Sequence, residues 1–156
     1  MTHSAAADSD IIRTYALLGG EDVIKRPVRN NIEAHDLLMT GLPTAALLYL
    51  LSQIVVLKNA GILDKAFGIS TRTLQRRKKD AGDKILSTEQ SNRAWKFAEI
   101  LGRATEVLGS NEDAELWMNS PVIGLDLHKP IDLLATSAGL EALENYLTRI
   151  EHGVYA

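Results

Sequence analysis

The segment from Ser87 to Gly109 is the part of the sequence that most constrains the fold. It opens with the capping-box pattern S-x-x-Q, in which Ser87 and Gln90 can each satisfy a free main-chain N–H group of the other. Small or apolar residues then recur every three or four positions, at Ala94, Ala98, Leu101, Thr105 and Leu108. Gly109 is a typical terminator. The segment therefore predicts one long helix from Ser87 toward Leu108.

Similar signals recur along most of the chain. The other predicted helices cover residues 30–40, 43–59, 62–67, 70–79, 111–118 and 136–152. Capping residues or glycines bound most of them, namely Asn30 or Asn31, Gly41, Gly61, Ser70, Ser110, Thr136 or Ser137, and Gly153. No alternating strand pattern follows Thr44, and aromatic residues make up only 5% of the chain. The sequence predicts an all-α fold.

Residues 1–29 are predicted to be a partly disordered lead-in. The opening MTHSAAADSD has neither the basic nor the apolar region of a signal peptide. The apolar stretch LPTAALLYLLSQIVVLKNAGIL is interrupted by Ser52 and Gln53 and falls short of the ~20 residues of a membrane span. The absence of cysteine fits a reducing compartment. We therefore expect a cytoplasmic protein without a membrane partner.

Charge is unevenly distributed along a chain whose formal net charge is -3. Residues 58–79 contain seven basic residues and one acid, Asp64. From Glu106 to the end there are nine acidic residues but only two basic ones, Lys129 and Arg149. Two zones of opposite sign predict two functional surfaces.

The basic zone has the anatomy of a helix-turn-helix motif. In ILDKAFGISTRTLQRRKK a short helix is followed by a turn at Gly68 and by a second helix capped by Ser70. Asp64 stands where an Ala is usual in the first helix of such motifs. The residues expected to point inward are Phe67, Ile69 and Leu74.

Helical geometry places Arg72, Arg76 and Lys79 almost opposite Leu74, which predicts an outward basic face. Arginine, glutamine and threonine side chains are those that recognise base edges in the major groove, whereas lysines at the helix end suit phosphates. The predicted DNA-binding residues are Ser70, Thr71, Arg72, Thr73, Gln75, Arg76, Lys78 and Lys79. The alternative is a solvated charged face. Because one such motif binds weakly, we expect a homodimer on two half-sites.

The last third of the chain resembles the toxin-binding domain of the Xre/MbcA/ParS antitoxin family. The matching features are Ala114 with Trp117, NSP ending at Pro121, PIDLL at residues 130–134, Gly139, and the closing L-x-R-I-E-H-G-V-Y-A. Before PIDLL, this chain has GLDLHK where Gly-Gly is usual. The resemblance implies domains at 30–86 for DNA binding and 87–156 for toxin binding and dimerisation.

The resemblance also implies a type II antitoxin that neutralises a RES-domain toxin, an enzyme that degrades NAD, and that represses its own operon on operator DNA. The residues predicted to bind the toxin are Pro121, Leu125, Pro130, Leu147, Arg149, Ile150, Glu151, Gly153, Val154, Tyr155 and Ala156. The last helix carries a stripe of Leu140, Leu143, Leu147, Ile150 and Val154, for which packing inside the monomer is an equal alternative.

Catalytic and cofactor signatures are missing from the sequence. The four histidines have no metal-ligand spacing, and Gly19-Gly20 is not part of a phosphate-binding loop. We therefore expect no enzyme activity, no metal and no cofactor. Two other functions stay open: a stand-alone helix-turn-helix regulator whose C-terminal module only dimerises, and a structural adaptor without a DNA role.

Overall fold

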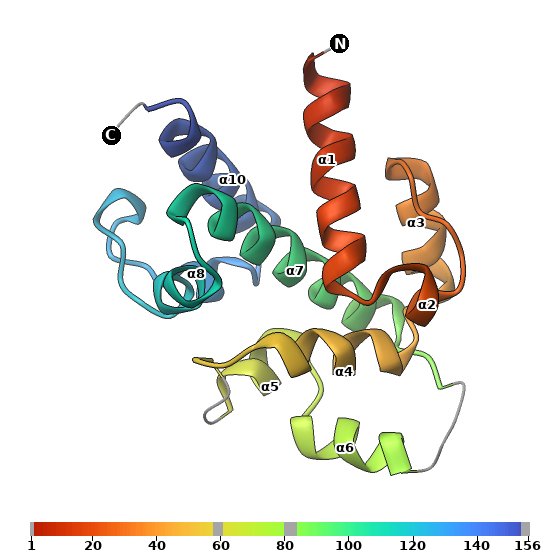
Figure 1. The fold of residues 1–156 in the computed structure, drawn as a ribbon. Coiled ribbons are helices and arrows are strands. Elements are labelled where there is room, and N and C mark those ends of the chain that lie inside the picture. The colour runs from red at the N-terminus through yellow and green to blue at the C-terminus, as the bar shows by residue number, and fades with distance from the viewer. Residues whose placement is uncertain (1, 58–60, 80–83, 154–156) are drawn as a thin grey trace.

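The computed structural model describes residues 2–57, 61–79 and 84–153, and within them the regular structure is helical (Figure 1). No strand occurs in these three ranges, which contain only two isolated antiparallel bridges, Pro43 with Ile85 and Val122 with His128. The predicted all-α fold is confirmed. None of the described helices is long and apolar enough to cross a membrane.

Helix α7 (Thr88–Leu108) is the centre of the fold and runs diagonally through the view of Figure 1. Its predicted capping box is present: the Ser87 hydroxyl accepts the Gln90 N–H at 3.0 Å, and the Gln90 side chain accepts the Ser87 N–H at 3.1 Å. Helices from both halves of the chain pack against α7, and its buried residues include Phe97, Ile100 and Leu101. One core therefore extends through the whole molecule.

The remaining helices surround α7 with short connections. They are α1 (Thr2–Leu17), α2 (Gly20–Ile24), α3 (Asn31–Thr40), α4 (Thr44–Gln53), α5 (Ile62–Phe67), α6 (Thr71–Lys79), α8 (Asn111–Met118), the 3-10 turn η1 (Ile123–Leu125), α9 (Pro130–Leu133) and α10 (Ser137–Glu151). Side-chain caps by Asn30, Ser110 and Thr136 fix the starts of α3, α8 and α10, as the sequence predicts.

Helix α4 is shorter than predicted, because it ends at Gln53 rather than near Asn59. The carboxylate of Glu115, on α8, accepts the N–H groups of Val55, Val56 and Leu57 at 3.1, 2.7 and 3.0 Å. Continuing the helix would require these N–H groups to bond to carbonyls of the preceding turn instead. The fully buried Glu115 thus ends α4 and joins α8 to the connection between α4 and α5.

Residues 1–29 also differ from the expected partly disordered lead-in, since α1 begins at Thr2 and packs along α7. Ile11, Thr14 and Leu18 are buried and follow one another at helical spacing. This stripe is short and contains a threonine, whose hydroxyl bonds to the Asp10 carbonyl at 2.7 Å. The apolar face of α1 explains why this segment is folded.

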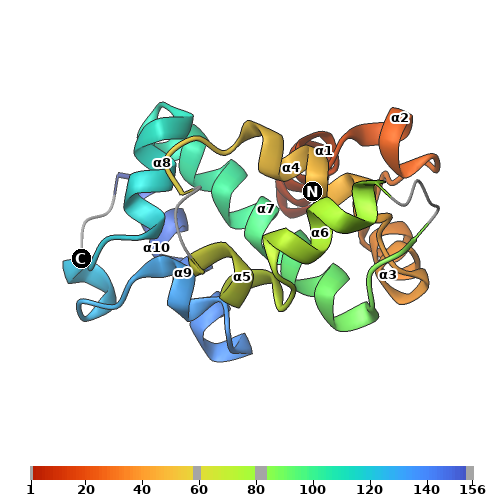
Figure 2. The same cartoon turned by 90° about the horizontal axis from the view of Figure 1, so that it is seen from below.

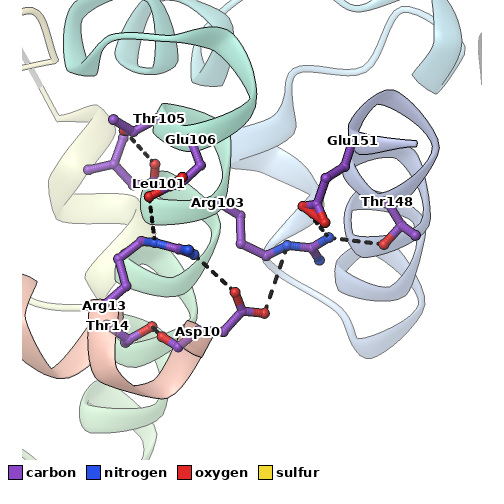
Figure 3. A network of polar contacts seen from close by, with 9 residues as sticks. All are labelled: Asp10, Arg13, Thr14, Leu101, Arg103, Thr105, Glu106, Thr148 and Glu151. Carbon is purple, nitrogen blue, oxygen red and sulfur yellow. Dashed lines mark hydrogen bonds and ion pairs between the residues drawn. The ribbon is translucent and has the colours of Figure 1, made fainter. Parts of the chain in front are cut away.

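A polar network holds the C-terminal half of α7 between α1 and α10 (Figure 3). The Arg103 guanidinium donates to the Thr148 hydroxyl at 2.9 Å and lies 3.9 Å from the carboxylates of Asp10 and Glu151. Arg13 pairs with Asp10 at 2.9 Å. Arg103 therefore ties the first and last helices to the central one.

Glu99 lies on α7 near the same junction and is partly buried. Burial is the main cause that raises the pKa of its carboxyl group to about 7, and the neighbouring carboxylates of Glu144 and Asp10 contribute to the same shift. A carboxyl group with this pKa is about half protonated at neutral pH. The junction consequently carries less negative charge than the formal count suggests.

Candidate functional site

The turn between α5 and α6 is held by side chains from both sides of it. Gly68 has φ of +70°, a conformation that residues with a Cβ rarely adopt, and it ends α5. The Ser70 hydroxyl accepts the Thr73 N–H at 3.0 Å, as predicted for its capping role. The Asp64 carboxylate accepts the Thr71 N–H at 2.9 Å. Asp64, the residue that departs from the usual alanine, thus helps to cap the second helix.

The three predicted anchors of this helix pair point into the core. Phe67 and Leu74 are fully buried and Ile69 is nearly so. The rings of Phe67 and Phe97 meet edge to face, with centroids 5.0 Å apart, so α5 is fixed on α7. Helix α6 packs against α4. Because α6 is held on one side only, its other side is free to face a partner.

The outward side of α6 presents Arg72, Gln75, Arg76 and Lys78 as exposed side chains, and Arg77 is partly buried. In the described ranges, none of these side chains takes part in a hydrogen bond or an ion pair. The side chain of Lys79, the last predicted member of this face, lies outside the described residues. Figure 1 shows α6 at the lower edge of the molecule.

Three other residues predicted to bind DNA make hydrogen bonds at the start of α6 instead. Ser70, Thr71 and Thr73 are partly buried. The hydroxyls of Ser70 and Thr73 bond to each other at 2.7 Å, while the N–H groups of Thr71 and Thr73 are taken by the caps described above. The side chains of Ser70 and Thr73 position α6, whereas Arg72, Gln75, Arg76 and Lys78 make up its accessible surface.

The C-terminal part of the chain is built around α8 and α10. The rings of Trp117 and Tyr146 stack with centroids 6.1 Å apart. A Cβ on Gly139, in the first turn of α10, would lie 2.1 Å from the carbonyl oxygen of Leu133. Glycine is therefore required where α10 passes α9, which gives a physical reason for this element of the family pattern.

The connection between α8 and α9 is a tight loop with an unusual backbone. The Val122 carbonyl accepts the Leu127 N–H at 2.8 Å, and the His128 carbonyl accepts the Val122 N–H at 3.2 Å. Asp126 and Leu127 have φ of +52° and +66°, in the left-handed region that favours glycine. They belong to the GLDLHK segment, which stands where the family usually has Gly-Gly. Asp126 and Leu127 are thus held in a strained backbone conformation, which costs about 1–3 kcal/mol for each residue.

This loop also carries the most exposed apolar surface of the described C-terminal part. Ile123 is 86% exposed and Leu127 is 65% exposed, whereas Leu125 between them is only 7% exposed. Leu125 is one of the residues predicted to bind a toxin, but it packs into the core. Ile123 and Leu127 are the accessible residues, and the sequence pattern alone did not single them out.

The other residues predicted to bind a toxin fall into three groups. Pro121, Arg149, Glu151 and Gly153 are exposed, and Ile150 is partly exposed. Pro130 and Leu147 are buried, so these two predictions, like Leu125, fall on core residues. Leu143 of the leucine stripe is buried too, which identifies the stripe largely as internal packing. Val154, Tyr155 and Ala156 lie outside the described residues.

Family models match both halves of the chain. A model described as the antitoxin Xre/MbcA/ParS C-terminal toxin-binding domain matches residues 103–153. A second model, described as the antitoxin Xre-like helix-turn-helix domain, matches residues 33–99. The two matches meet within α7, the helix that both halves share.

Curated relatives agree with these matches. Antitoxin Xre of Yersinia enterocolitica is 31% identical over 93 residues, which cover 59% of this chain and 62% of the relative. Antitoxin Xre of Photorhabdus laumondii is 31% identical over 88 residues, covering 56% and 58%. The Prs ADP-ribosylating antitoxin of a Sphingobium species is 27% identical over 104 residues, covering 61% and 64%.

The matched part of the chain thus spans less than two thirds of the length of each of these relatives. The two domain models nevertheless follow one another along the chain and account for most of it. The chain belongs to the Xre/MbcA/ParS antitoxin family, with an Xre-like helix-turn-helix domain followed by a small helical toxin-binding domain.

Proposed function

We propose that this chain binds a RES-domain toxin, blocks the active site with which that toxin degrades NAD, and represses its own operon as a homodimer. The observation that carries the proposal is the match of residues 103–153 to a toxin-binding domain. The same chain presents an open basic face on α6, which suits operator DNA. A stand-alone regulator would not need a domain of the toxin-binding type.

Charge supports the pairing with an NAD-consuming enzyme. NAD carries two phosphates, so the site that binds it should contain basic groups. The C-terminal part of this chain has nine acids against two bases from Glu106 onward. Opposite charges would steer this part of the antitoxin toward the mouth of such a site.

The relative named Prs ADP-ribosylating antitoxin suggests a second candidate target, an ADP-ribosylating toxin. ADP-ribosyl transfer also uses NAD as its substrate, so the charge argument applies equally to both targets. Measuring NAD consumption by the purified toxin, with and without an acceptor protein, distinguishes them. Consumption without any acceptor is expected for the RES-type reaction.

The blocking mechanism can be tested by removing residues 153–156. We propose that α10 docks beside the toxin's active site and that the segment after it, with Tyr155, enters the site. The truncated protein is expected to fold and bind DNA but to leave NAD degradation uninhibited in a mixture of purified proteins. If it still inhibits at equal concentration, the blocking surface is on the helices, and if the full chain never inhibits, the proposed function itself is wrong.

The exposed loop residues give a second test of toxin binding. Because Ile123 and Leu127 contribute little to the core, Ile123→Ser and Leu127→Ser should leave the unfolding midpoint nearly unchanged. Each is expected to weaken toxin binding by about 10- to 30-fold, as an apolar anchor at an interface would. Ile32→Ser, on α3 and 71% exposed, is the matched control. Equal affinities for all three variants in titration calorimetry would exclude the loop from the interface.

A further inference from the structure

A cleft lies at the junction between the helix-turn-helix motif and the toxin-binding domain. It has a volume of about 360 Å³ and is lined by residues of α5 and α9, with contributions from α7 and the end of α8. Seen from below in Figure 2, α9, α5 and α6 follow one another from left to right. The cleft, which is lined by α5 and α9, thus lies in the same row of helices as α6, the helix expected to face DNA.

Positive charge gathers in this cleft from both domains. Lys65 of α5, Arg93 of α7 and Lys129 at the start of α9 line it, together with one acid, Asp132. Arg93 is already engaged, donating to Glu89 at 3.0 Å and to the Lys65 carbonyl at 3.2 Å. In the described ranges, the ammonium groups of Lys65 and Lys129 have neither a hydrogen bond nor an ion pair. Two cations are therefore available to an anionic ligand.

The position of Lys129 is notable because the acidic C-terminal part has only one other cation, Arg149. DNA would repel this part of the protein wherever the two approach each other. In a helix-turn-helix protein, the first helix of the motif crosses the phosphate backbone, and here that helix is α5, which carries Lys65. One of the two cations that follow Glu106, Lys129, thus lies next to the path expected for the phosphates.

We propose that the sugar–phosphate backbone beside the major groove enters this cleft and is bound by Lys65 and Lys129, so that the toxin-binding domain is part of the DNA-binding surface. The inference rests on the DNA-binding part of the proposed function. The apolar residues Ile62, Ala66 and Ile131 offer surface to the deoxyribose, while the lysines neutralise phosphate charge. These contacts position the protein and do not specify sequence.

Salt dependence of DNA binding by the full chain tests this assignment. Binding of a duplex taken from the region upstream of the chain's own gene, and of a random-sequence duplex, is measured between 0.05 and roughly 0.3 M salt, a range over which phosphate contacts are sensitive. Lys129→Ala should make the slope of log K against log salt shallower by about one for each bound protomer and weaken both duplexes about eightfold per protomer near 0.1 M. Arg149→Ala removes the same charge from the same domain and should leave the slope unchanged.

A charge change of opposite sign gives an independent check. Asp132→Asn removes the one carboxylate that lines the cleft and should strengthen binding to both duplexes. The inference is overturned if Lys129→Ala leaves the salt slope unchanged, or if Arg149→Ala changes it equally. The DNA-binding face on α6 is tested separately, by an Arg72→Ala/Arg76→Ala variant. Loss of binding in that variant upholds this face even where the inference about the cleft fails. Intact binding in that double variant would instead overturn the DNA-binding face and this inference with it.

Discussion

Replacing both Arg72 and Arg76 by alanine is expected to weaken operator binding by roughly 30-fold to 10⁴-fold for each bound half-site. Both side chains are exposed on α6, on the side opposite the buried Leu74, and neither has a partner among the described residues. A good contact between arginine and guanine contributes about 1–3 kcal/mol, so two such contacts give about 2–6 kcal/mol. Because nothing in the core changes, stability and toxin neutralisation should be retained.

The measurement is a fluorescence titration of the operator duplex beside a random-sequence duplex at one fixed salt concentration. Loss of base contacts should remove most of the difference in affinity between the two duplexes. The matched control is Arg26→Ala/Arg29→Ala, which removes two positive charges outside the helix-turn-helix motif. If this control loses as much affinity as the α6 variant, α6 is not the recognition helix.

Helix boundaries were predictable where the stabilising hydrogen bonds are local. The capping box of α7 joins residues three positions apart, and the caps by Asn30, Ser110 and Thr136 have the same short range. Such contacts depend only on residue types at fixed spacing, so the sequence contains all the information needed.

The end of α4 could not be predicted in this way. It is determined by a carboxylate that is 58 to 60 residues away in the chain and comes close only in the folded protein. The sequence instead has neither glycine nor proline between Pro43 and Gly61, which favours a longer helix. The structured α1 was missed because its stripe of buried residues is short and interrupted by Thr14.

The two candidate surfaces were predictable to different degrees. On α6, a single apolar anchor fixes which side faces out, so the positions of Arg72 and Arg76 followed from helical geometry. On α10, the same spacing of leucines serves either an internal or an external contact, and the structure shows that Leu147 is internal. In the loop, the direction of the apolar side chains depends on the positive φ angles of Asp126 and Leu127. The residue types at these positions do not predict such angles.

Replacing Glu115 by alanine is expected to destabilise the protein by roughly 3–5 kcal/mol. The fully buried carboxylate accepts three main-chain N–H groups from the connection between α4 and α5, and its removal leaves these buried and partly buried donors without their acceptor. Each unsatisfied buried donor costs about 1–3 kcal/mol, and the three losses overlap because the segment can relax together. Glu115→Gln keeps one acceptor oxygen and should lose less.

Urea unfolding measures these differences, and Glu112→Ala on the exposed side of α8 is the control, expected to stay within about 0.5 kcal/mol of the parent. Equal midpoints for the Glu115 and Glu112 variants would mean that the connection after α4 does not depend on this carboxylate.

The expected loss of stability should also affect function. Glu115 belongs to the toxin-binding domain but holds the backbone that leads into α5, the first helix of the DNA-binding motif. A variant that loosens this contact should therefore weaken DNA binding as well.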